Sequence, residues 1–457
     1  MTASVHAAPR PGGRMRGGYL RVGPTPALAA IWTGAAAVIF LWWHDTPFVI
    51  GFAGWITNAG RITGLLAGYL VVVLLALMAR VPALERGVGT DRLARWHAMT
   101  GRYTVSLAVA HTLLIIWGYA VTAHQNVVTE TGSLLTSYTD VLMGTVALGL
   151  LVIVGITSAR AARHRVSYET WHFVHLYTYL GIALAFSHQF STGADFVTNL
   201  QARVLWSALY LIVAAALFWY RLIVPIVQAV RHQLRVVEVR REAPDTVSVW
   251  LSGRDLDRLR AEPGQFFRWR FLARGMWWAA NPYSLSAPPT HNLMRITVKD
   301  AGDHSRSLLR LQPGTRVLAE GPFGAFTSAR RRMGKVLLLA GGVGITPIRA
   351  LFESLPGRPG ELTLIYRAGN AGEVVFRDEL EWIAEQRGAR LLYLLGRRGQ
   401  GRRIDPLNAE ALKKSVPLLR EHDVYVCGPP GMTDHARAEL RRAGVPRRQI
   451  HQESFTF

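Results

Sequence analysis

The first half of the chain contains six apolar runs, each near the length that crosses about 30 Å of hydrocarbon. They are Ala27–Trp43, Ile62–Ala79, Met99–Ala123, Val141–Ala159, Tyr168–His188 and Val204–Val224. This pattern predicts a six-helix transmembrane bundle over residues 27–225, preceded by a Pro/Gly/Arg-rich tail at residues 1–26. Because the first run begins late and five others follow, a cleaved signal peptide is the less favoured interpretation.

Arginines are concentrated in alternate connections between these runs. The rich segments carry Arg10, Arg14, Arg16 and Arg21, then Arg80, Arg86, Arg92 and Arg95, then Arg160, Arg163 and Arg165. The segments 44–60 and 124–140 hold none, and 189–203 holds only Arg203. The positive-inside rule places the tail and everything after Val224 in the cytoplasm. We therefore expect a multi-pass plasma-membrane protein whose third and fifth helices both run outward.

Two histidine pairs lie within or directly beside the third and fifth runs. His97 and His111 are 14 residues apart, and His175 and His188 are 13 apart. At about 1.5 Å per residue each pair spans roughly 20 Å, which predicts His97 and His175 near the inner face and the other two near the outer face. A spacing of 13 turns His188 about 140° away from His175 on an ideal helix. Helix tilt or an irregular turn is needed to absorb that difference.

Histidine is costly in hydrocarbon, so all four are candidates for function. They are either polar contacts between helices, members of a proton relay, or axial ligands of two b-type haems. The matched depths of the two pairs favour haem ligation, in which two histidines close the coordination of each iron.

The net charge is +22, from 52 basic and 30 acidic residues. We see no nucleic-acid-binding motif, so a membrane surface is the expected partner of this charge and nucleic acid is not. We expect the Arg330–Arg332 run to face lipid or solvent. Arg61, at the outer start of the second run, is either a snorkelling arginine or a site for an anion. The single cysteine, Cys427, excludes an internal disulfide.

After Arg231 the chain changes to short β-branched segments between Gly/Pro turns. LRVVEV, TVSVWLSG, GQFFRWRF, MRITVKD and TRVLAEG predict an antiparallel β-barrel over residues 231–330. KVLLLA, ELTLIYR, LLYLL and DVYVCG then alternate with helical segments, which predicts an α/β domain with a parallel sheet over residues 331–457. The fold class is therefore multi-domain: a helical membrane bundle, a barrel and a parallel α/β layer.

The turn GGVGITP joins a strand to a helix start, where free N–H groups and the helix dipole favour a pyrophosphate. CGPPGM ends a later strand and strengthens this interpretation. With these motifs, residues 231–457 resemble a ferredoxin–NADP reductase-type module, a flavin barrel followed by a nicotinamide domain. NPYSLS and VKDAGDHSRSL resemble its flavin motifs, with Asn281 where the family usually has Arg or His.

The resemblance implies FAD and a nicotinamide nucleotide as cofactors. The implied FAD contacts are Pro282, Tyr283, Ser284, His304, Ser305 and Arg306. The implied nucleotide contacts are Gly341, Gly342, Val343, Gly344, Ile345, Thr346, Pro347, Gly428, Pro429 and Met432. The implied catalytic residues are Phe457, which would cover the flavin as the aromatic end of ESFTF, and Cys427, which would lie beside the nicotinamide. Arg367 and Arg397, which follow the second and third strands, favour NADPH over NADH as the donor.

The membrane half resembles the ferric reductase transmembrane domain, and the two halves in this order resemble the ferric reductase and NADPH oxidase superfamily. The resemblance implies two haems held by His97, His111, His175 and His188. It implies an oxidoreductase that moves electrons from cytoplasmic NAD(P)H through FAD and both haems to an external one-electron acceptor. A ferric chelate is the expected acceptor. The alternative acceptor is oxygen, which an NADPH oxidase reduces to superoxide. From the residues alone, a membrane transporter with a regulatory nucleotide domain stays open.

Overall fold

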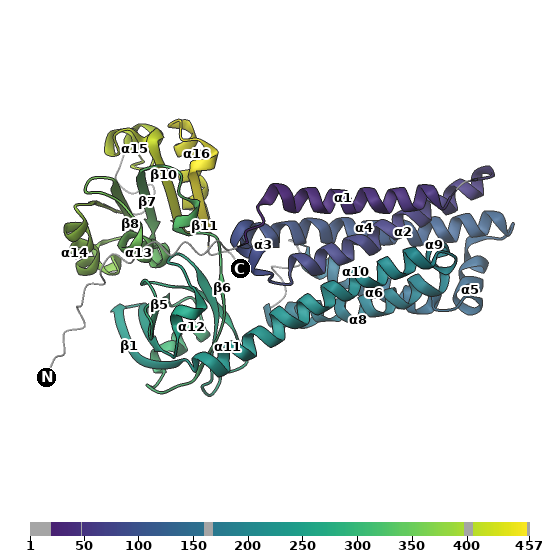
Figure 1. Ribbon diagram of the computed structural model, residues 1–457, viewed down its shortest axis with the longest axis horizontal. Helices are drawn as coiled ribbons and strands as arrows, with labels where there is room; N and C mark the ends of the chain where they lie inside the picture. The colour runs from purple at the N-terminus through teal and green to yellow at the C-terminus, as the bar shows by residue number, and fades with distance from the viewer. Residues whose placement is uncertain (1–19, 47, 160–167, 397–404, 455–457) are drawn as a thin grey trace.

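The computed structural model describes residues 20–46, 48–159, 168–396 and 405–454. A helical bundle forms one end of the molecule and two strand-containing domains form the other (Figure 1). In the described part of the bundle six helices are long: α1 (Pro24–His44), α2 (Gly51–Leu77), α4 (Thr90–Thr122), α6 (Val141–Ser158), α8 (Tyr168–Thr192) and α10 (Leu200–Phe218). Five of them, counting α10 with its continuation to His232, are long and apolar enough to cross a membrane. Within the described ranges α8 is not among those five.

The helices extend beyond the predicted runs. Helix α2 begins at Gly51 rather than at Ile62, and α4 begins at Thr90 rather than at Met99. The added turns contain polar and charged residues, at which a hydropathy pattern stops. Because α4 has 33 residues, it is roughly 50 Å long, more than the hydrocarbon requires. The short helices α3 (Pro82–Gly87), α5 (Val127–Ser137) and α9 (Ala194–Val197) lie in the connections.

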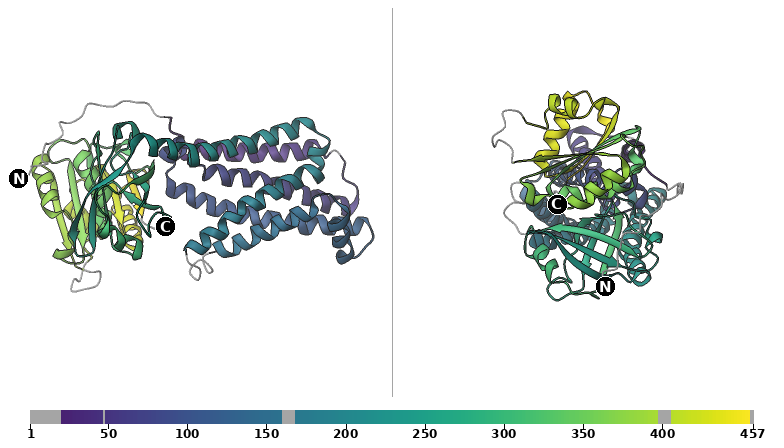
Figure 2. Two further views of the ribbon diagram at one scale, coloured as in Figure 1. Left: turned by 90° about the horizontal axis from the view of Figure 1, so that it is seen from below. Right: turned by 90° about the vertical axis from the view of Figure 1, so that its left-hand side faces the viewer.

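A single uninterrupted helical segment joins the bundle to the strand-containing half. It consists of α10, a π-helical turn η1 (Trp219–Ile223) and α11 (Val224–His232) (Figure 2, left). The Arg221 Nε donates to the carbonyl oxygen of Met78 over 2.9 Å, and the Gln228 Nε2 donates to that of Gly321 over 2.8 Å. The membrane helix therefore continues past residue 225, and its end packs against the first strand-containing domain.

Six strands form that domain, here called the antiparallel domain. They are β1 (Arg235–Ala243), β2 (Thr246–Ser252), β3 (Phe266–Phe271), β4 (Asn281–Ser284), β5 (Leu293–Lys299) and β6 (Val317–Phe323), with α12 (Asp303–Ser307) between the last two. They make two three-stranded antiparallel sheets, β1-β2-β5 and β4-β3-β6, linked by isolated bridges such as Leu285 with Ile296. NPYS lies outside the five predicted strand segments, yet it forms the edge strand β4, where a proline is tolerated.

A five-stranded parallel sheet, order β11-β10-β7-β8-β9, forms the last domain, here called the parallel-sheet domain. Its strands are β7 (Lys335–Gly341), β8 (Leu362–Ala368), β9 (Arg390–Leu395), β10 (His422–Gly428) and β11 (Ile450–Ser454). Helices α13 (Ile345–Ser354) and α14 (Arg377–Arg387) cover one face, and α15 (Ala409–Ser415) and α16 (Pro430–Arg442) cover the other. Both faces are thus buried, as a parallel sheet requires.

Arginines hold the bundle against the other domains. Arg80, just after α2, forms an ion pair with Glu320 of β6, and Arg268 of β3 lies 3.6 Å from the same carboxylate. Arg330 donates through Nη2 to the carbonyl oxygen of Gly87 over 3.2 Å. The expectation that the Arg330–Arg332 run faces lipid or solvent is therefore wrong for Arg330, because its guanidinium finds backbone acceptors at the junction.

Candidate redox-cofactor sites

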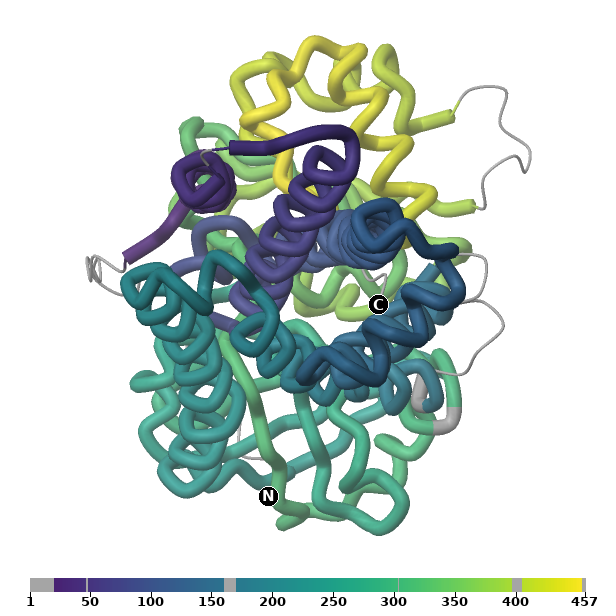
Figure 3. Tube along the Cα trace, turned by 90° about the vertical axis from the view of Figure 1, so that its right-hand side faces the viewer, coloured from purple at the N-terminus to yellow at the C-terminus, as the bar shows by residue number. Residues whose placement is uncertain are grey.

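The two predicted histidine pairs face each other in the bundle. The ring centres of His97 and His175 are 6.1 Å apart, and those of His111 and His188 are 6.4 Å apart. Helix α4 packs along α2, and α8 packs along α6, whereas the backbones of α4 and α8 have few direct contacts. Figure 3 looks along this bundle from the end remote from the strand-containing domains. The rings therefore meet across the separation between α4 and α8.

The 13-residue spacing does not require an irregular turn. Helix α8 is continuous α-helix from Tyr168 to Thr192, yet both of its ligand candidates reach a histidine of α4. Both histidines of α8 therefore come within about one ring separation of a histidine of α4, at 6.1 and 6.4 Å between ring centres, without a break in the helix.

Hydrogen bonds donated by Nδ1 orient three of the four imidazoles. The acceptors are the carbonyl oxygen of Leu74 for His97 (3.2 Å), that of Gly60 for His111 (2.8 Å), and Thr192 Oγ1 for His188 (3.2 Å). His175 Nδ1 is buried with no hydrogen-bond partner in the described structure. A histidine that donates from Nδ1 presents an unprotonated Nε2, the usual arrangement around a metal.

The spacing of the rings fits an iron between them. A metal–imidazole bond is about 2 Å long, so two imidazoles on opposite sides of one metal hold their ring centres roughly 6 Å apart. In the described residues, no group of three or more His, Cys, Asp or Glu side chains is placed to hold a metal ion. Two ligands per site suit a group that brings its own equatorial nitrogens, as haem does.

Glycines allow the outer rings to pack closely against neighbouring helices. A Cβ added to Gly64 of α2 would lie 2.6 Å from His111 Nδ1, and one added to Gly144 of α6 would lie 2.9 Å from the His188 ring. Both distances are shorter than a normal van der Waals contact, so neither position has room for a side chain beside the histidine ring. The helix backbones themselves therefore form part of the outer site.

The flavin motifs of the antiparallel domain contain unused buried donors. Strand β4 pairs with β3, which brings Tyr283 beside Phe267, and burial raises the pKa of the Tyr283 phenol. Asn281 Nδ2 and His304 Nε2 are buried and have no hydrogen-bond partner in the part of the chain described. Because buried polar atoms are normally paired, these two nitrogens are suited to a bound ligand.

The pyrophosphate candidates are together on α12. His304, Ser305 and Arg306 are consecutive there, and Arg306 Nε lies 3.0 Å from Asp300 Oδ2. A bound pyrophosphate would compete with the Asp300 carboxylate for this guanidinium.

The two nucleotide motifs touch each other at the end of the parallel sheet. A Cβ at Gly344 would lie 2.3 Å from the Cys427 carbonyl oxygen, and a Cβ at Gly341 would lie 2.2 Å from the Met432 sulfur. At Gly344 the close atoms are backbone, so glycine is required where GGVGITP crosses CGPPGM, whereas at Gly341 the Met432 side chain would have to move. Gly428 and Pro429 lie in the same contact. Cys427 itself is fully buried, and burial raises the pKa of its thiol well above the usual range.

A cavity of about 660 Å³ lies where the bundle and both other domains meet. The start of α4, the segment after β6, α16 and β11 line it, and Glu453 reaches it from β11, opposite Cys427 in the sheet register. Glu453 Oε2 is buried without a partner in the described residues, and burial, reinforced by the charge of Asp91, raises the pKa of this carboxyl well above the usual range. Burial therefore favours the uncharged form of this carboxyl.

Two family models match separate parts of the chain. The family described as ferric reductase like transmembrane component matches residues 63–186, and the oxidoreductase NAD-binding domain matches residues 338–438. The chain has a fused, ferric reductase-like architecture. Its other half is similar to reductase modules with FAD- and NAD-binding domains.

Among curated proteins, the ferredoxin reductase component of 3-ketosteroid-9-alpha-monooxygenase from Mycobacterium tuberculosis is 34% identical over 43% of this chain and 56% of its own length. A flavohemoprotein from Pseudomonas putida is 30% identical over 49% of this chain and 59% of its own. The chain thus spans little more than half of these relatives. The flavohem-like FAD/NAD-binding domain of a nitric oxide dioxygenase from Vibrio cholerae O1 biovar El Tor is 25% identical, covering 49% of this chain and 98% of that one, with a TM-score of 0.40.

Two features of the structure depart from the sequence-based expectations. Arg367 Nη1 lies 3.7 Å from Asp405 Oδ1, so the fold places an acid beside the arginine that was expected to favour a 2′-phosphate. Arg61 donates to Asp195 over 2.8 Å, so its charge is compensated rather than available to an anion. Arg397 and Phe457 lie outside the described residues.

Glu453 was not among the sequence candidates for the site. Glu453 is the acid of the ESFTF segment, which the sequence analysis singled out for its aromatic end. Nothing in the sequence reveals that its carboxyl faces the junction cavity without a hydrogen-bond partner. The carbonyl acceptors of the histidines were also missed, because backbone atoms carry no sequence signature.

Proposed function

We propose that the chain moves electrons from cytoplasmic NAD(P)H, through FAD and two b-type haems, to a one-electron acceptor on the other side of the membrane. Residues 27–225 would form the di-haem transmembrane domain, 231–330 the FAD domain and 331–457 the NAD(P) domain. The N-terminal tail and both soluble domains would be cytoplasmic. The acceptor proposed first is a ferric chelate.

The two stacked histidine pairs carry this proposal. Their ring separations of 6.1 and 6.4 Å suit one iron each, and the residues of each helix pair lie roughly 20 Å apart along the axis. Structural histidines or a proton relay would not need two facing pairs with the same spacing. Arginines gathered in alternate connections support an inner pair of His97 with His175, close to the domains that supply electrons.

The chain would bind, orient and separate the cofactors. When bound, FAD accepts a hydride and releases single electrons, and the haem irons carry single electrons between the membrane faces. The glycine turn Gly341–Pro347 would receive the nucleotide pyrophosphate at the start of α13. Asn281 Nδ2 and His304 Nε2 would donate to the flavin. The Glu453 carboxyl, whose uncharged form burial favours, would offer a proton-holding group beside the junction cavity.

Arg367 favours NADPH over NADH less clearly in the structure than in the sequence. Arg367 suits a 2′-phosphate, but Asp405 already pairs with it, and an acid disfavours that phosphate while it can accept from a ribose hydroxyl. We propose NADPH as the donor, with NADH the alternative.

Redox difference spectra of the purified holoprotein test the haem assignment. We expect a low-spin b-haem signal with two haems per chain that NAD(P)H reduces, and we expect its loss when all four histidines are replaced. A spectrum that lacks this signal, or that keeps it without the histidines, would contradict the proposal and favour a transporter with a regulatory domain.

The acceptor is tested separately by NADPH consumption without oxygen, with and without a ferric chelate. Consumption that depends on the chelate supports a ferric reductase. Consumption that requires oxygen and yields superoxide identifies the alternative, an NADPH oxidase.

A further inference from the structure

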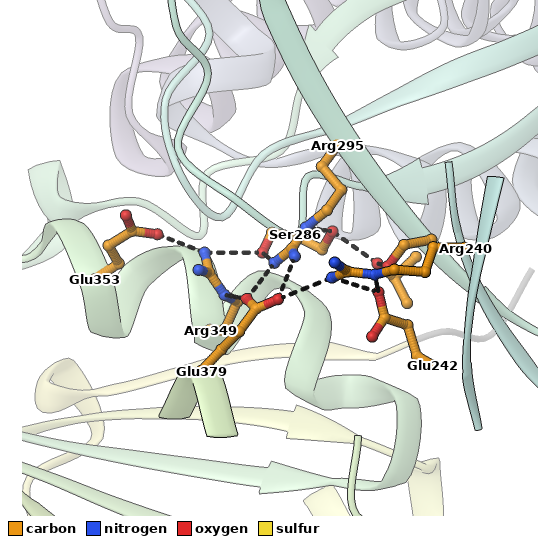
Figure 4. A network of polar contacts seen from close by, with 9 residues as sticks. Arg240, Glu242, Ser286, Arg295, Arg349, Glu353 and Glu379 are labelled. Carbon is orange, nitrogen blue, oxygen red and sulfur yellow. Dashed lines mark hydrogen bonds and ion pairs between the residues drawn. The ribbon is translucent and has the colours of Figure 1, made fainter. Parts of the chain in front are cut away.

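A cluster of charged side chains lies between the antiparallel and parallel-sheet domains (Figure 4). Its members, here called the interdomain charge cluster, are Arg240, Glu242, Arg295, Arg349, Glu353 and Glu379. Glu379 in the first turn of α14 is at its centre. Arginines from β1, β5 and α13 all contact this one carboxylate.

Arg295 makes the tightest contact across the domain boundary. Its Nη1 and Nη2 donate to the two oxygens of Glu379 over 2.8 and 3.0 Å, a bidentate pair that fixes direction as well as distance. The Arg295 side chain is only 1% exposed. Its guanidinium lies 5.1 Å from the Trp250 ring in its own domain and 4.5 Å from the Phe376 ring in the other. Both domains therefore surround this single cation.

The cluster reaches both cofactor motifs through the backbone. Arg295 Nη2 and Arg349 Nη1 both donate to the carbonyl oxygen of Ser286, over 2.9 and 3.3 Å. Ser286 is the last residue of the flavin motif NPYSLS, and Arg349 is two residues beyond the nucleotide turn. A rigid link of a few bonds thus connects the flavin motif to the nucleotide turn.

Glu379 remains charged under all working conditions. Burial would raise the pKa of this carboxyl, but the hydrogen bond and charge of Arg295, with those of Arg349, outweigh burial and hold the pKa at about 2. Removing this charge would take from the buried Arg295 its carboxylate partner and leave Arg349 with Glu353 alone, which is costly.

We propose that Glu379 is a positioning residue for hydride transfer: it holds the parallel-sheet domain against the antiparallel domain so that the nicotinamide reaches the flavin. This rests on the proposed function. Hydride transfer is sensitive to such placement, because an error of about 1 Å costs roughly 100-fold in rate. Nucleotide affinity depends instead on the glycine turn within one domain, so it is not expected to change.

The variant Glu379→Gln keeps the size of the side chain and removes its charge. In the full-length holoprotein we expect the limiting rate of flavin reduction by NADPH, measured by stopped flow, to fall roughly 10- to 100-fold. The nucleotide dissociation constant and the bound FAD should not change. The deuterium isotope effect, measured with NADPH labelled at the transferred position, should increase, a change that lower stability alone would not produce.

Glu353→Gln is the matched control. Glu353 pairs with Arg349, but both residues are on α13, so the change removes no contact between domains and should leave the rate unchanged. Arg295→Lys provides a second variant that keeps the charge and loses the bidentate contact, and it should slow flavin reduction in the same direction.

Glu379→Gln and Arg295→Lys proteins that reduce flavin at the wild-type limiting rate and isotope effect would overturn the inference. Tighter or weaker nucleotide binding as the sole change would overturn it as well. A wild-type holoprotein whose flavin NAD(P)H does not reduce contradicts the proposed function instead, so the two failures are distinguishable.

Discussion

The inner and outer histidine pairs lie on the same two helices, yet their surroundings differ. In the outer pair, His111 and His188 both donate from Nδ1, and glycines of α2 and α6 lie against both rings. In the inner pair, only His97 has an acceptor. His175 has none in the described structure, and the Trp171 indole lies 5.1 Å from its ring instead.

This difference teaches that equal spacing in sequence does not produce equal sites. A hydrogen bond to Nδ1 fixes the tautomer and increases the electron donation of the imidazole. The outer pair has two such bonds and a backbone wall, so its geometry is strongly specified. The inner pair, next to the proposed electron source, is held more loosely and by an aromatic contact.

Replacing one histidine at a time should separate the two sites most sharply. In His97→Ala the inner haem is lost, and NAD(P)H should reduce the flavin but no haem. In His111→Ala the outer haem is lost, and the inner one should still be reduced. Anaerobic spectra of the two variants measure this. The reverse result would exchange the inner and outer assignments.

Gly64→Ala should affect the outer pair alone. The added Cβ would lie 2.6 Å from His111 Nδ1, and the ring cannot yield without breaking its bond to the Gly60 carbonyl oxygen. We expect bound haem to fall from two per chain to one. Gly101→Ala on α4 is the control, because its Cβ would meet only Leu74 at 3.8 Å and both haems should remain. A Gly64→Ala protein with full haem content would show that the outer site adapts more easily than its packing indicates.

Thr192→Val should weaken the outer site without removing it. The substitution deletes the acceptor of His188 Nδ1, and the loss of such a contact typically costs about 10- to 100-fold in metal affinity. Haem titration of the apoprotein and the midpoint potential of the outer haem measure the effect. Thr178→Val is the matched control, since its hydroxyl donates only to the His175 carbonyl oxygen over 2.6 Å. Equal effects of both substitutions would argue against a role for the Nδ1 contact.

The smallest effect is expected for Trp171→Phe at the inner pair. The shorter ring keeps an aromatic neighbour near His175 but loses its indole contact, so the inner midpoint potential should shift slightly while the outer one stays constant. Phe173→Leu, on an exposed face of α8, should shift neither potential. Potentiometric titration followed in the haem bands resolves the two. A shift confined to the outer haem would contradict the proximity of Trp171 to His175.

The sequence predicted the parts of this structure that local patterns determine. Hydropathy located the long helices, and matched spacing identified both histidine pairs. GGVGITP and CGPPGM were recognised as two nucleotide motifs, and the structure brings them into contact. The starts of α2 and α4 were misplaced because polar residues there find partners within the protein.

Tertiary partners could not be predicted from local patterns. Asp405 reaches Arg367 from a distant segment, and Arg295 meets Glu379 across a domain boundary. The acceptors of the histidines are carbonyl oxygens, which every residue has. Such contacts depend on how elements pack, which periodicity and motifs do not specify.

The uninterrupted helix from Leu200 to His232 makes the proposed electron transfer sensitive to bilayer thickness. A helix longer than the local hydrocarbon responds to a thinner bilayer by tilting. Since α11 packs on β6 and Gln228 binds the Gly321 carbonyl oxygen, the antiparallel domain must turn with the helix. Hydrophobic mismatch would then change the distance between flavin and inner haem, so lipids of different acyl-chain length should give different rates of haem reduction from the same protein.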